Sequence, residues 1–524
     1  MSHEKWIVWG NHLSASGERI AVGQPLADLT THLLVSGTTG SGKSTLLRNL
    51  ALQAADAGAT VIVIEPHGDL VLHPQEGILA ALSEDQLRRT TVVDLASSWP
   101  PQMNLVTSGI EAGRSVAVQG AMRTIRTMDD ASYSVAIQMR AILENALYVL
   151  MSSADRDGQE TSLLHLQQFL EEATFRESII RRAGADAMEA KRFWNRTLAE
   201  WSERKGGGVD ILAVPLRRTS QFLRDDRFRR SLALPTLAPE LALDIGALLD
   251  GPEPRLLLVP LQGPVLGETA KRVFGSLFLQ AVTNTLLARG SSGKARRQTL
   301  IIIDEFPDFA GEDMGELVKT LLAQARKFGA SVVLGTQFLA QLPRDVQAEV
   351  RANCNNKIAL ATQDSKDAKA VVEAMASPSV TPLDVQNIEK WHGYARLRVN
   401  QAPQPPFYFA ALPPLPHLEN GRHAASNGHR GRPPRGLEAL QALHQRAAGG
   451  EVEALLAELT ALTNEQFAQL VQQQVTANRY AAQQLLSRPA LEPDPVARAL
   501  QISRAKHGLP WWFYEAQYRR LRTG

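Results

Sequence analysis

The sequence predicts an α/β fold with a mostly parallel sheet, an inserted all-α domain and a helical C-terminal tail. Short runs of consecutive apolar, often β-branched residues recur along the chain, which is typical of parallel strands buried on both faces. Amphipathic stretches separate these runs, and this alternation indicates a doubly wound core. Long stretches with helical spacing and no such runs occupy the middle and the end of the chain.

The first part of the core is expected over residues 1–104. It opens with a short strand-rich lead-in that includes the alternating residues 6–9. Buried strands are then predicted at 33–35, 61–64 and 91–93. The first of them ends at a glycine-rich turn that leads into a helix-like stretch from Lys43 to Ala57.

Residues 105–235 lack β-rich runs and carry apolar residues at helical spacing, so an all-α insertion domain is predicted there. Its later half contains four basic pairs: Arg181-Arg182, Lys191-Arg192, Arg217-Arg218 and Arg229-Arg230. Glu and Asp are interspersed among them. Two interpretations are therefore open, namely solvated helix faces and a surface that faces nucleic acid.

The second part of the core is expected over residues 236–413. Its predicted strands lie at 256–259, 300–303, 332–334 and 357–360. Residues 414–436 are rich in Pro, Gly, His and Arg and are predicted to be a linker. A helical tail over 437–524 ends in aromatic and basic residues, which can contact DNA or a neighbouring subunit. Packing against its own domain is the simpler interpretation.

The overall composition limits the cell compartment and the class of partner. The 524 residues carry a formal net charge of +2, which is too small to indicate nucleic-acid binding unless basic residues are locally concentrated. The single cysteine, Cys354, excludes an intramolecular disulfide and a zinc site built on several cysteines. No signal peptide or membrane-spanning run of about 18 apolar residues is recognisable. A cytoplasmic protein without a membrane span is therefore expected.

A glycine-rich loop between the first buried strand and its helix is the strongest motif. It consists of Gly37, Thr38, Thr39, Gly40, Ser41, Gly42, Lys43, Ser44 and Thr45, and it matches the full phosphate-loop pattern. Glycines let the backbone wrap so that amide groups point at phosphate oxygens, and the helix N-terminus adds a partial positive charge. Lys43 is expected to reach the β and γ phosphates of ATP, and Ser44 to bind Mg²⁺.

A pair of acidic residues follows the predicted strand at 300–303. Asp304 is expected to hold Mg²⁺ through water, and Glu305 to polarise the attacking water as a general base. An acidic pair after a strand is often only a helix N-cap. Its combination with a phosphate loop favours ATP hydrolysis.

Three further residues are candidates for the same chemistry. Gln337 would lie beside the γ phosphate if its strand neighbours the Asp304 strand; otherwise it is a solvated turn residue. Arg326 ends the intervening helix, where it is either a dipole partner or an arginine that reaches the γ phosphate of a neighbouring subunit. Glu65 ends a strand that can adjoin the phosphate loop, where it could help to place Mg²⁺ or couple to DNA.

Taken together, residues 32–44, 64–70 and 303–306 resemble the HerA/FtsK superfamily, and within it the type IV secretion coupling proteins of the TraG/TraD/TrwB kind. Supporting segments lie at 261–268, 325–329, 335–337, 352–358 and 367–368. The likeness covers most of residues 30–413.

This resemblance implies a RecA-like P-loop ATPase core and a ring of subunits, expected to be a hexamer, that pumps DNA in conjugation or mobile-element transfer. It implies ATP and Mg²⁺ as cofactors, and as partners single- or double-stranded DNA, further copies of the chain, and relaxase or secretion-channel proteins. Asp304, Glu305 and Gln337 would be catalytic. Arg326 falls where the family has its trans-acting arginine.

The sequence departs from this family in two ways. Coupling proteins usually carry N-terminal membrane helices, which are not expected here. Either a partner recruits the protein to the inner membrane, or the chain is a soluble relative that acts in DNA processing or antiviral defence. Glu65 also stands where relatives more often have Asp.

Two other functions share the predicted nucleotide site. A secretion ATPase that moves protein would use every one of its residues, and only DNA stimulation of ATP turnover separates it from a DNA pump. An ATP-dependent assembly scaffold would need no steady turnover. The pair Asp304 and Glu305 argues against the scaffold, because a pure switch has less need of a general base.

Overall fold

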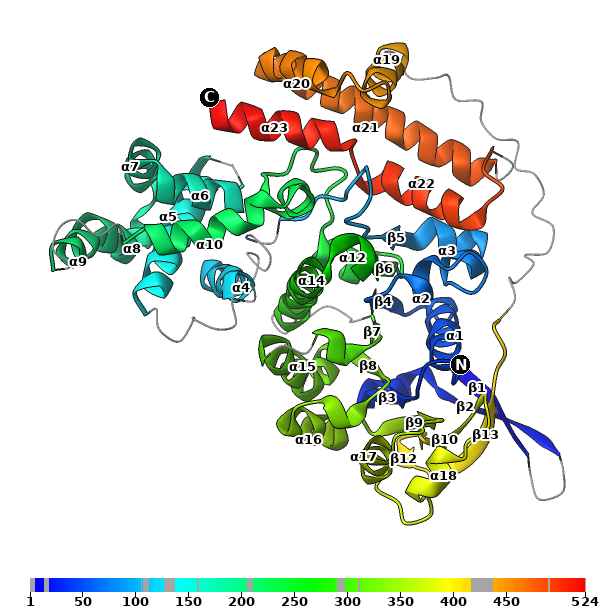
Figure 1. Ribbon diagram of the computed structural model, residues 1–524. Coiled ribbons are helices and arrows are strands. Elements are labelled where there is room, and N and C mark those ends of the chain that lie inside the picture. The colour runs from blue at the N-terminus through cyan, green and yellow to red at the C-terminus, as the bar shows by residue number, and fades with distance from the viewer. Residues whose placement is uncertain are drawn as a thin grey trace.

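The structure is a computed structural model that describes residues 5–13, 18–104, 106, 113–126, 137–157, 160–204, 211–289, 297–309, 312–415, 437–488 and 491–523. One large sheet forms the centre, helices cover both of its faces, and two further groups of helices lie beside and above it (Figure 1). This arrangement confirms the predicted fold class. Among the described helices, none combines the length and the apolar character needed to cross a membrane.

The sheet has eleven strands in the order β2-β1-β13-β10-β9-β3-β8-β7-β4-β6-β5. Their bounds are β1 Trp6–Leu13, β2 Arg19–Pro25, β3 Leu33–Ser36, β4 Thr60–Glu65, β5 Thr90–Val92, β6 Leu256–Pro260, β7 Thr299–Ile303, β8 Ala330–Thr336, β9 Asn356–Leu360, β10 His392–Arg396 and β13 Phe407–Ala411. All pairs from β9 to β5 in this order are parallel. The strand before the phosphate loop, β3, is therefore central, and β8 separates it from β7.

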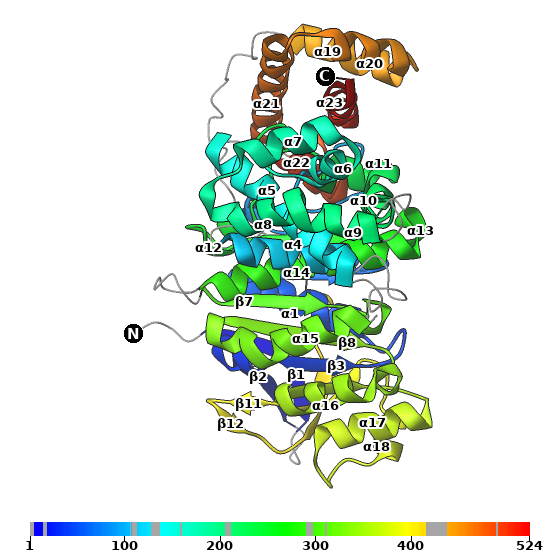
Figure 2. The same cartoon turned by 90° about the vertical axis from the view of Figure 1, so that its left-hand side faces the viewer.

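Alternate residues of the parallel strands enter two different hydrophobic clusters, one on each face of the sheet. Leu33 and Val35 pack with the helix α1 (Lys43–Asp56), whereas Leu34 packs on the opposite face. That opposite face is covered by α14 (Glu268–Ala288), α15 (Glu312–Gln324), α16 (Arg344–Asn353) and α17 (Ser365–Met375), as Figure 2 shows. Burial on both faces explains why these strands are continuously apolar.

An antiparallel extension enlarges the sheet beyond the parallel strands. β10 pairs with β9, β13 with β10, β1 with β13, and β2 with β1. The lead-in strands β1 and β2 thus join the sheet through the late strand β13, and a separate small ladder joins β11 (Arg398–Val399) to β12 (Ala402–Pro403). Sequence reasoning did not predict strands after β9. The extension matters for the site because β10 begins where β9 ends.

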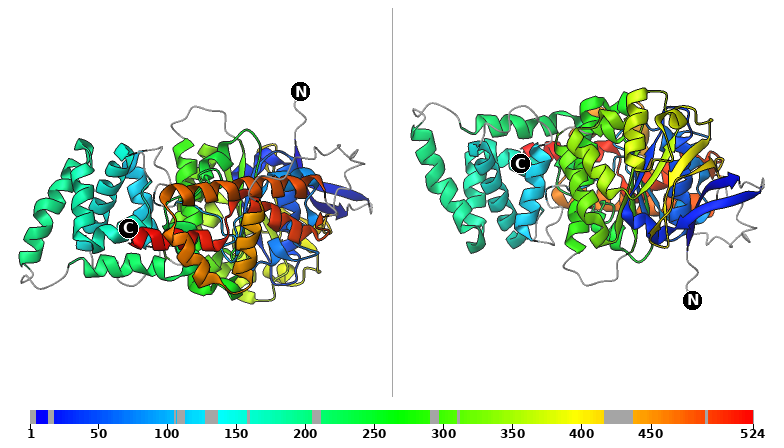
Figure 3. Two further views of the ribbon diagram at one scale, coloured as in Figure 1. Left: turned by 90° about the horizontal axis from the view of Figure 1, so that it is seen from above. Right: turned by 90° about the horizontal axis from the view of Figure 1, so that it is seen from below.

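The described residues between β5 and β6 contain helices and turns from residue 106 onward. The helices are α4 Arg114–Arg126, α5 Ile137–Asp157, α6 Leu163–Glu171, α7 Ala173–Arg182, α8 Met188–Arg192, α9 Leu198–Arg204, α10 Ala213–Arg224, α11 Asp226–Phe228 and α12 Ile245–Asp250. Helices α4 to α10 project to one side of the sheet (Figure 3). The remaining short α-helices are α2 Asp69–Leu72, α3 Glu84–Arg89, α13 Gly263–Leu266 and α18 Pro382–Gln386.

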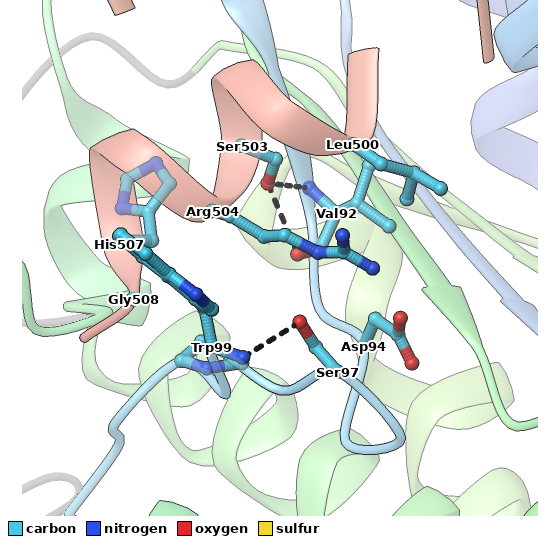
Figure 4. Close-up of a pocket in the computed structure, with 10 residues that line it drawn as sticks. Val92, Asp94, Ser97, Trp99, Leu500, Ser503, Arg504, His507 and Gly508 are labelled. Atoms are coloured by element: carbon cyan, nitrogen blue, oxygen red, sulfur yellow. Dashed lines mark hydrogen bonds between the residues drawn. The ribbon is translucent and has the colours of Figure 1, made fainter. Parts of the chain in front are cut away.

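The C-terminal helices pack against the protein's own core. They are α19 Leu437–Ala448, α20 Val452–Ala461, α21 Asn464–Ser487, α22 Pro495–His507 and α23 Trp511–Thr523. The hydroxyl of Ser503 on α22 accepts a hydrogen bond from Val92 N at 2.8 Å and donates one to Val92 O at 3.1 Å, beside a narrow cavity (Figure 4). Arg498 forms a bidentate ion pair with Glu84. The Ser503 contacts cover the edge strand β5, whose backbone groups would otherwise be left unpaired.

Candidate nucleotide-binding site

The phosphate loop is attached to both strands that flank β3. Gly37 N donates a hydrogen bond to Thr336 O at the end of β8 (3.1 Å), and Thr38 N donates to Ala361 O just after β9 (3.0 Å). The loop therefore starts at the carboxyl edge of the parallel strands, which is where open α/β sheets bind ligands.

Glycines of the loop are required by its backbone path. Gly40 and Gly42 have φ angles of 78° and 105°, a region that side chains other than glycine rarely adopt. A Cβ atom on Gly37 would lie 2.6 Å from the hydroxyl of Ser41. That hydroxyl is buried and has no hydrogen-bond partner within the described residues, so it is available to a phosphate oxygen bound in the loop.

Lys43 begins α1 and points at the two predicted acidic residues. Its side chain is only 5% exposed, and its Nζ lies 2.8 Å from Asp304 Oδ1 and also pairs with Glu305 Oε1. A buried ammonium needs anionic partners, and here the two carboxylates supply them. A triphosphate that enters the loop would offer Lys43 a competing set of anionic oxygens.

Gln337 stands between the loop and the acidic pair. β8 pairs with β7, with Leu334 opposite Ile303, so the condition under which Gln337 was expected at this site is met. Its side-chain oxygen accepts a hydrogen bond from Thr39 Oγ1 at 3.0 Å, and its backbone N–H donates to Glu305 Oε2 at 3.2 Å. One residue thus contacts both parts of the candidate site.

The acidic pair adopts an unusual local geometry. Glu305 has a φ angle of 46°, and its N–H donates to Asp304 Oδ1 at 3.0 Å. Asp304 also lies so close to β8 that a Cβ on Gly335 would be 2.6 Å from Asp304 Oδ1. Positive φ at a non-glycine residue is costly and concentrates at functional sites. The sequence did not predict this close approach to Gly335. The only feature that could have indicated it is the presence of a glycine at the end of a buried strand.

Glu65 does not lie where it was expected. Its strand β4 pairs with β6 and β7 and not with β3, so the expectation that it adjoins the phosphate loop was wrong. The carboxylate accepts hydrogen bonds from His67 N and Gly68 N, each at 2.7 Å. Burial raises the pKa of Glu65 to about 8, and the nearby charge of Asp304 adds to the rise. The local hydrogen bonds only partly oppose this effect.

Arg326 lies at the opposite edge of the sheet. It belongs to a short 3-10 turn, Ala325–Phe328, that precedes β8, and its side chain is exposed. β8 spans seven residues, so at a rise of about 3.3 Å per residue roughly 20 Å separate this turn from Gln337. Arg326 therefore does not join the nucleotide site of its own chain.

The donors at the site fit a magnesium ion carried by a nucleotide. Ser44 supplies a hydroxyl oxygen at the start of α1, and Asp304 supplies a carboxylate. Mg²⁺ prefers such oxygen ligands and is typically held by one or two protein groups together with phosphates and water. Within the described residues, no cluster of three or more His, Cys, Asp or Glu side chains forms a self-sufficient metal site.

One of the four basic pairs anchors the C-terminal tail. Arg229 pairs with Glu515 at 2.6 Å and lies 4.5 Å from the ring centroid of Tyr518. Arg230 lies 4.5 Å from the ring centroid of Trp511. Cation–π contacts of this kind hold α23 against the helical part of the chain, so these two arginines are engaged within the protein.

Two family models match parts of the chain. Residues 7–184, which include the phosphate loop, match the central domain of the helicase HerA. Residues 259–402, which include Asp304, Glu305, Arg326 and Gln337, match the DNA-binding domain of type IV secretion-system coupling proteins. A search of curated proteins found no match.

Solved structures of a plasmid coupling protein have a similar fold. The unbound monoclinic form of the bacterial conjugative coupling protein TrwBdeltaN70 is 16% identical, with a TM-score of 0.50 over 76% of this chain and 89% of that one. TrwB with a non-hydrolysable GTP analogue is 17% identical, with a TM-score of 0.50 over 78% and 91%. TrwB with ADP and Mg²⁺ is 18% identical, with a TM-score of 0.47 over 77% and 91%.

The family models and the fold lead to the same conclusion. One model covers the phosphate loop, the other covers the acidic pair, and the folded chain brings the two together through Lys43. The resemblance found in the sequence is thereby confirmed: one segment of the chain matches the HerA central domain, another matches the DNA-binding domain of type IV secretion-system coupling proteins, and the fold is similar to that of TrwB.

Proposed function

We propose that this protein hydrolyses ATP with the help of Mg²⁺ and uses the energy to move DNA through a ring of subunits, most simply a hexamer. The observation that carries the proposal is the buried contact of Lys43 with Asp304 and Glu305 beneath a complete phosphate loop. A lysine, a carboxylate for the metal and a carboxylate for water are the parts that ATP hydrolysis needs.

The same residues suggest how the site would work. Lys43 would exchange its contacts with the carboxylates for the β and γ phosphates, which leaves Glu305 free to accept a proton from the attacking water. Bound Mg²⁺ would neutralise charge on the phosphates. Asp304, held by the N–H of Glu305, would orient that ion through water, and Ser44 would contact it directly.

Communication between subunits would pass along β8. Gln337, at one end, contacts the loop and Glu305, so a change at the γ phosphate would alter its hydrogen bonds. Arg326 precedes the other end of the same strand. We propose that Arg326 acts on the nucleotide of the adjacent subunit, because the length of β8 separates it from the nucleotide site of its own chain. A complete site then requires a ring.

DNA is the polymer that the family match favours, since residues 259–402 match a coupling-protein DNA-binding domain. Contacts in a translocation channel would be made chiefly to phosphates, so DNA binding should depend strongly on salt and weakly on sequence. Conjugation or mobile-element transfer is the proposed setting, in the cytoplasm, with a relaxase and a secretion-channel protein as partners. A partner would link the protein to the inner membrane.

One experiment tests this function directly. The ATPase rate of the purified protein is measured with Mg²⁺ alone, with single-stranded DNA and with double-stranded DNA, and the particle mass is measured in the same samples. The expected result is DNA-stimulated turnover in a ring-sized particle. An ATPase rate that is the same with and without DNA would favour an ATPase that moves protein. A monomer that consumes no ATP under any condition would overturn the proposal.

A further inference from the structure

An exposed tryptophan packs against the phosphate loop. Trp391 is 44% exposed, which is unusual for so large an apolar side chain. A Cβ atom built on Gly42 would lie 2.8 Å from Trp391 Cε3, so the indole edge rests directly on the last glycine before Lys43. The Nζ of Lys390 lies 4.8 Å from the ring centroid. Within the described part of the chain, the indole N–H has no hydrogen-bond partner.

The sheet places this tryptophan on a defined side of the loop. β3 lies between β8 and β9. The acidic pair lies on the β8 side, because it follows β7. Trp391 lies on the β9 side, because it directly precedes β10, whose Gly393 pairs with Leu360 at the end of β9. A nucleotide whose γ phosphate faces Asp304 and Glu305 would extend its other end, the base, toward β9 and β10.

The backbone holds Trp391 in a strained conformation. Its φ angle is 68°, in the left-handed region that bulky residues avoid. Its carbonyl accepts a hydrogen bond from Ala411 N at 2.8 Å, and the neighbouring His392 N bonds to Glu389 O at 3.0 Å. The antiparallel extension of the sheet thus fixes the tryptophan at the loop. Strain of this kind persists where the surrounding structure imposes it, most often at ligand sites.

We propose that Trp391 is the platform on which the base of the bound nucleotide stacks. The inference rests on the proposed function, and it adds a base subsite to the phosphate and metal groups already described. An indole face offers a flat, apolar surface to any base, and such stacking requires no hydrogen-bond pattern. Trp391 therefore contributes affinity for nucleotides without selecting one purine over the other.

Stacking on Trp391 predicts a specific pattern of binding constants. Loss of an aromatic platform for one base is expected to weaken nucleotide binding about tenfold. The loss should be the same for ATP and for GTP, because both bases present a π-face. Inorganic tripolyphosphate has no base, so its affinity for the phosphate loop should not change.

The test compares ATP, GTP and inorganic tripolyphosphate, each with Mg²⁺, by isothermal titration calorimetry. Trp391→Ala removes the platform, Trp391→Phe keeps an aromatic face, and Trp391→Leu keeps apolar bulk only. The matched control is Trp6→Ala, which removes a tryptophan of similar exposure, 46%, on the lead-in strand β1. Thermal unfolding of each variant checks that the fold is intact. If the Ala variant does not fold, the nucleotide affinities of the Phe and Leu variants are compared instead.

We expect Trp391→Ala and Trp391→Leu to bind ATP and GTP about tenfold more weakly than the parent protein. Trp391→Phe should bind both nucleotides with nearly the affinity of the parent. The affinity for tripolyphosphate should be unchanged in all three variants. Unchanged ATP affinity in the Ala and Leu variants would overturn the assignment. An equal loss for ATP and tripolyphosphate would also overturn it, because the tryptophan would then merely support the loop. If the parent protein bound neither ATP nor tripolyphosphate, the nucleotide site itself would be wrong.

Discussion

Nζ of Lys43 lies 2.8 Å from Oδ1 of Asp304, and this buried contact joins residues that are 261 positions apart in the chain. The first belongs to the HerA-like segment and the second to the coupling-protein segment. Neither segment has a complete site alone.

Replacement of Lys43 by alanine should impair both binding and stability. ATP affinity should fall by roughly 1.5–3 kcal/mol, because a charge-assisted hydrogen bond is lost. Without nucleotide, two buried carboxylates would lose their cation, at a cost of roughly 3–5 kcal/mol. Calorimetric ATP titration and urea unfolding measure the two effects. Lys366→Ala, which removes an exposed lysine of α17, should change neither quantity.

Glu305→Gln should separate binding from turnover. The amide keeps the size of the side chain but cannot accept a proton from water, so turnover should fall by about 10²- to 10⁴-fold while ATP still binds. Steady-state phosphate release and a binding titration on the same sample give the comparison. Glu438→Gln, on the surface of α19, is the matched control. Normal turnover in the Glu305 variant would refute its role as general base.

The proposed role of Arg326 can be tested by mixing inactive variants. Arg326→Ala and Lys43→Ala should each be inactive alone. In mixed rings, an interface that takes its phosphate loop from the first variant and its arginine from the second is complete. With equal amounts and random assembly, up to about a quarter of the interfaces are of this kind. Recovery of ATPase activity on mixing is therefore expected, and its absence would contradict action between subunits.

Glu65 should make the stability of the protein depend on pH. Its pKa is about 8 in the folded chain and 4.5 ordinarily, so between these values the folded state holds a proton that the unfolded state releases. The free energy of unfolding should therefore fall as pH rises from about 4.5 to 8. In Glu65→Gln the free energy of unfolding should depend less on pH in this range. Near pH 8 the variant should be more stable than the parent protein. Urea unfolding at a series of pH values compares the variant with the parent, and identical slopes would contradict the prediction.

Gly335→Ala should displace the side chain of Asp304 by steric contact with the added methyl group. The added methyl group would lie 2.6 Å from Asp304 Oδ1 and 3.1 Å from Leu47 Cδ1. Overpacking of this kind costs roughly 1–3 kcal/mol and should displace the carboxylate, with lower ATP turnover. Gly246→Ala is the control, because that glycine lies in the helix α12 and an added methyl group would have only one near atom, Asp244 Oδ1 at 3.1 Å. The control should retain turnover and stability.

The local parts of the site could be predicted from the sequence. The phosphate loop is one continuous segment whose glycines, lysine and hydroxyls are set by the chemistry of binding phosphate. Asp304 and Glu305 follow a strand whose uninterrupted apolar residues reveal burial on both faces. Such features depend on neighbours along the chain, so the sequence displays them directly.

Only the tertiary structure decided which strands are neighbours. In the folded chain β8 lies between β3 and β7, so Gln337 lies at the site. β4 lies on the far side of β7, so Glu65 does not adjoin the phosphate loop. The tertiary structure also carried Trp391 to Gly42 through an antiparallel extension that no local pattern indicated. Strand order follows from long-range packing and backbone pairing, and the spacing of apolar residues in one strand is the same whichever strand lies beside it.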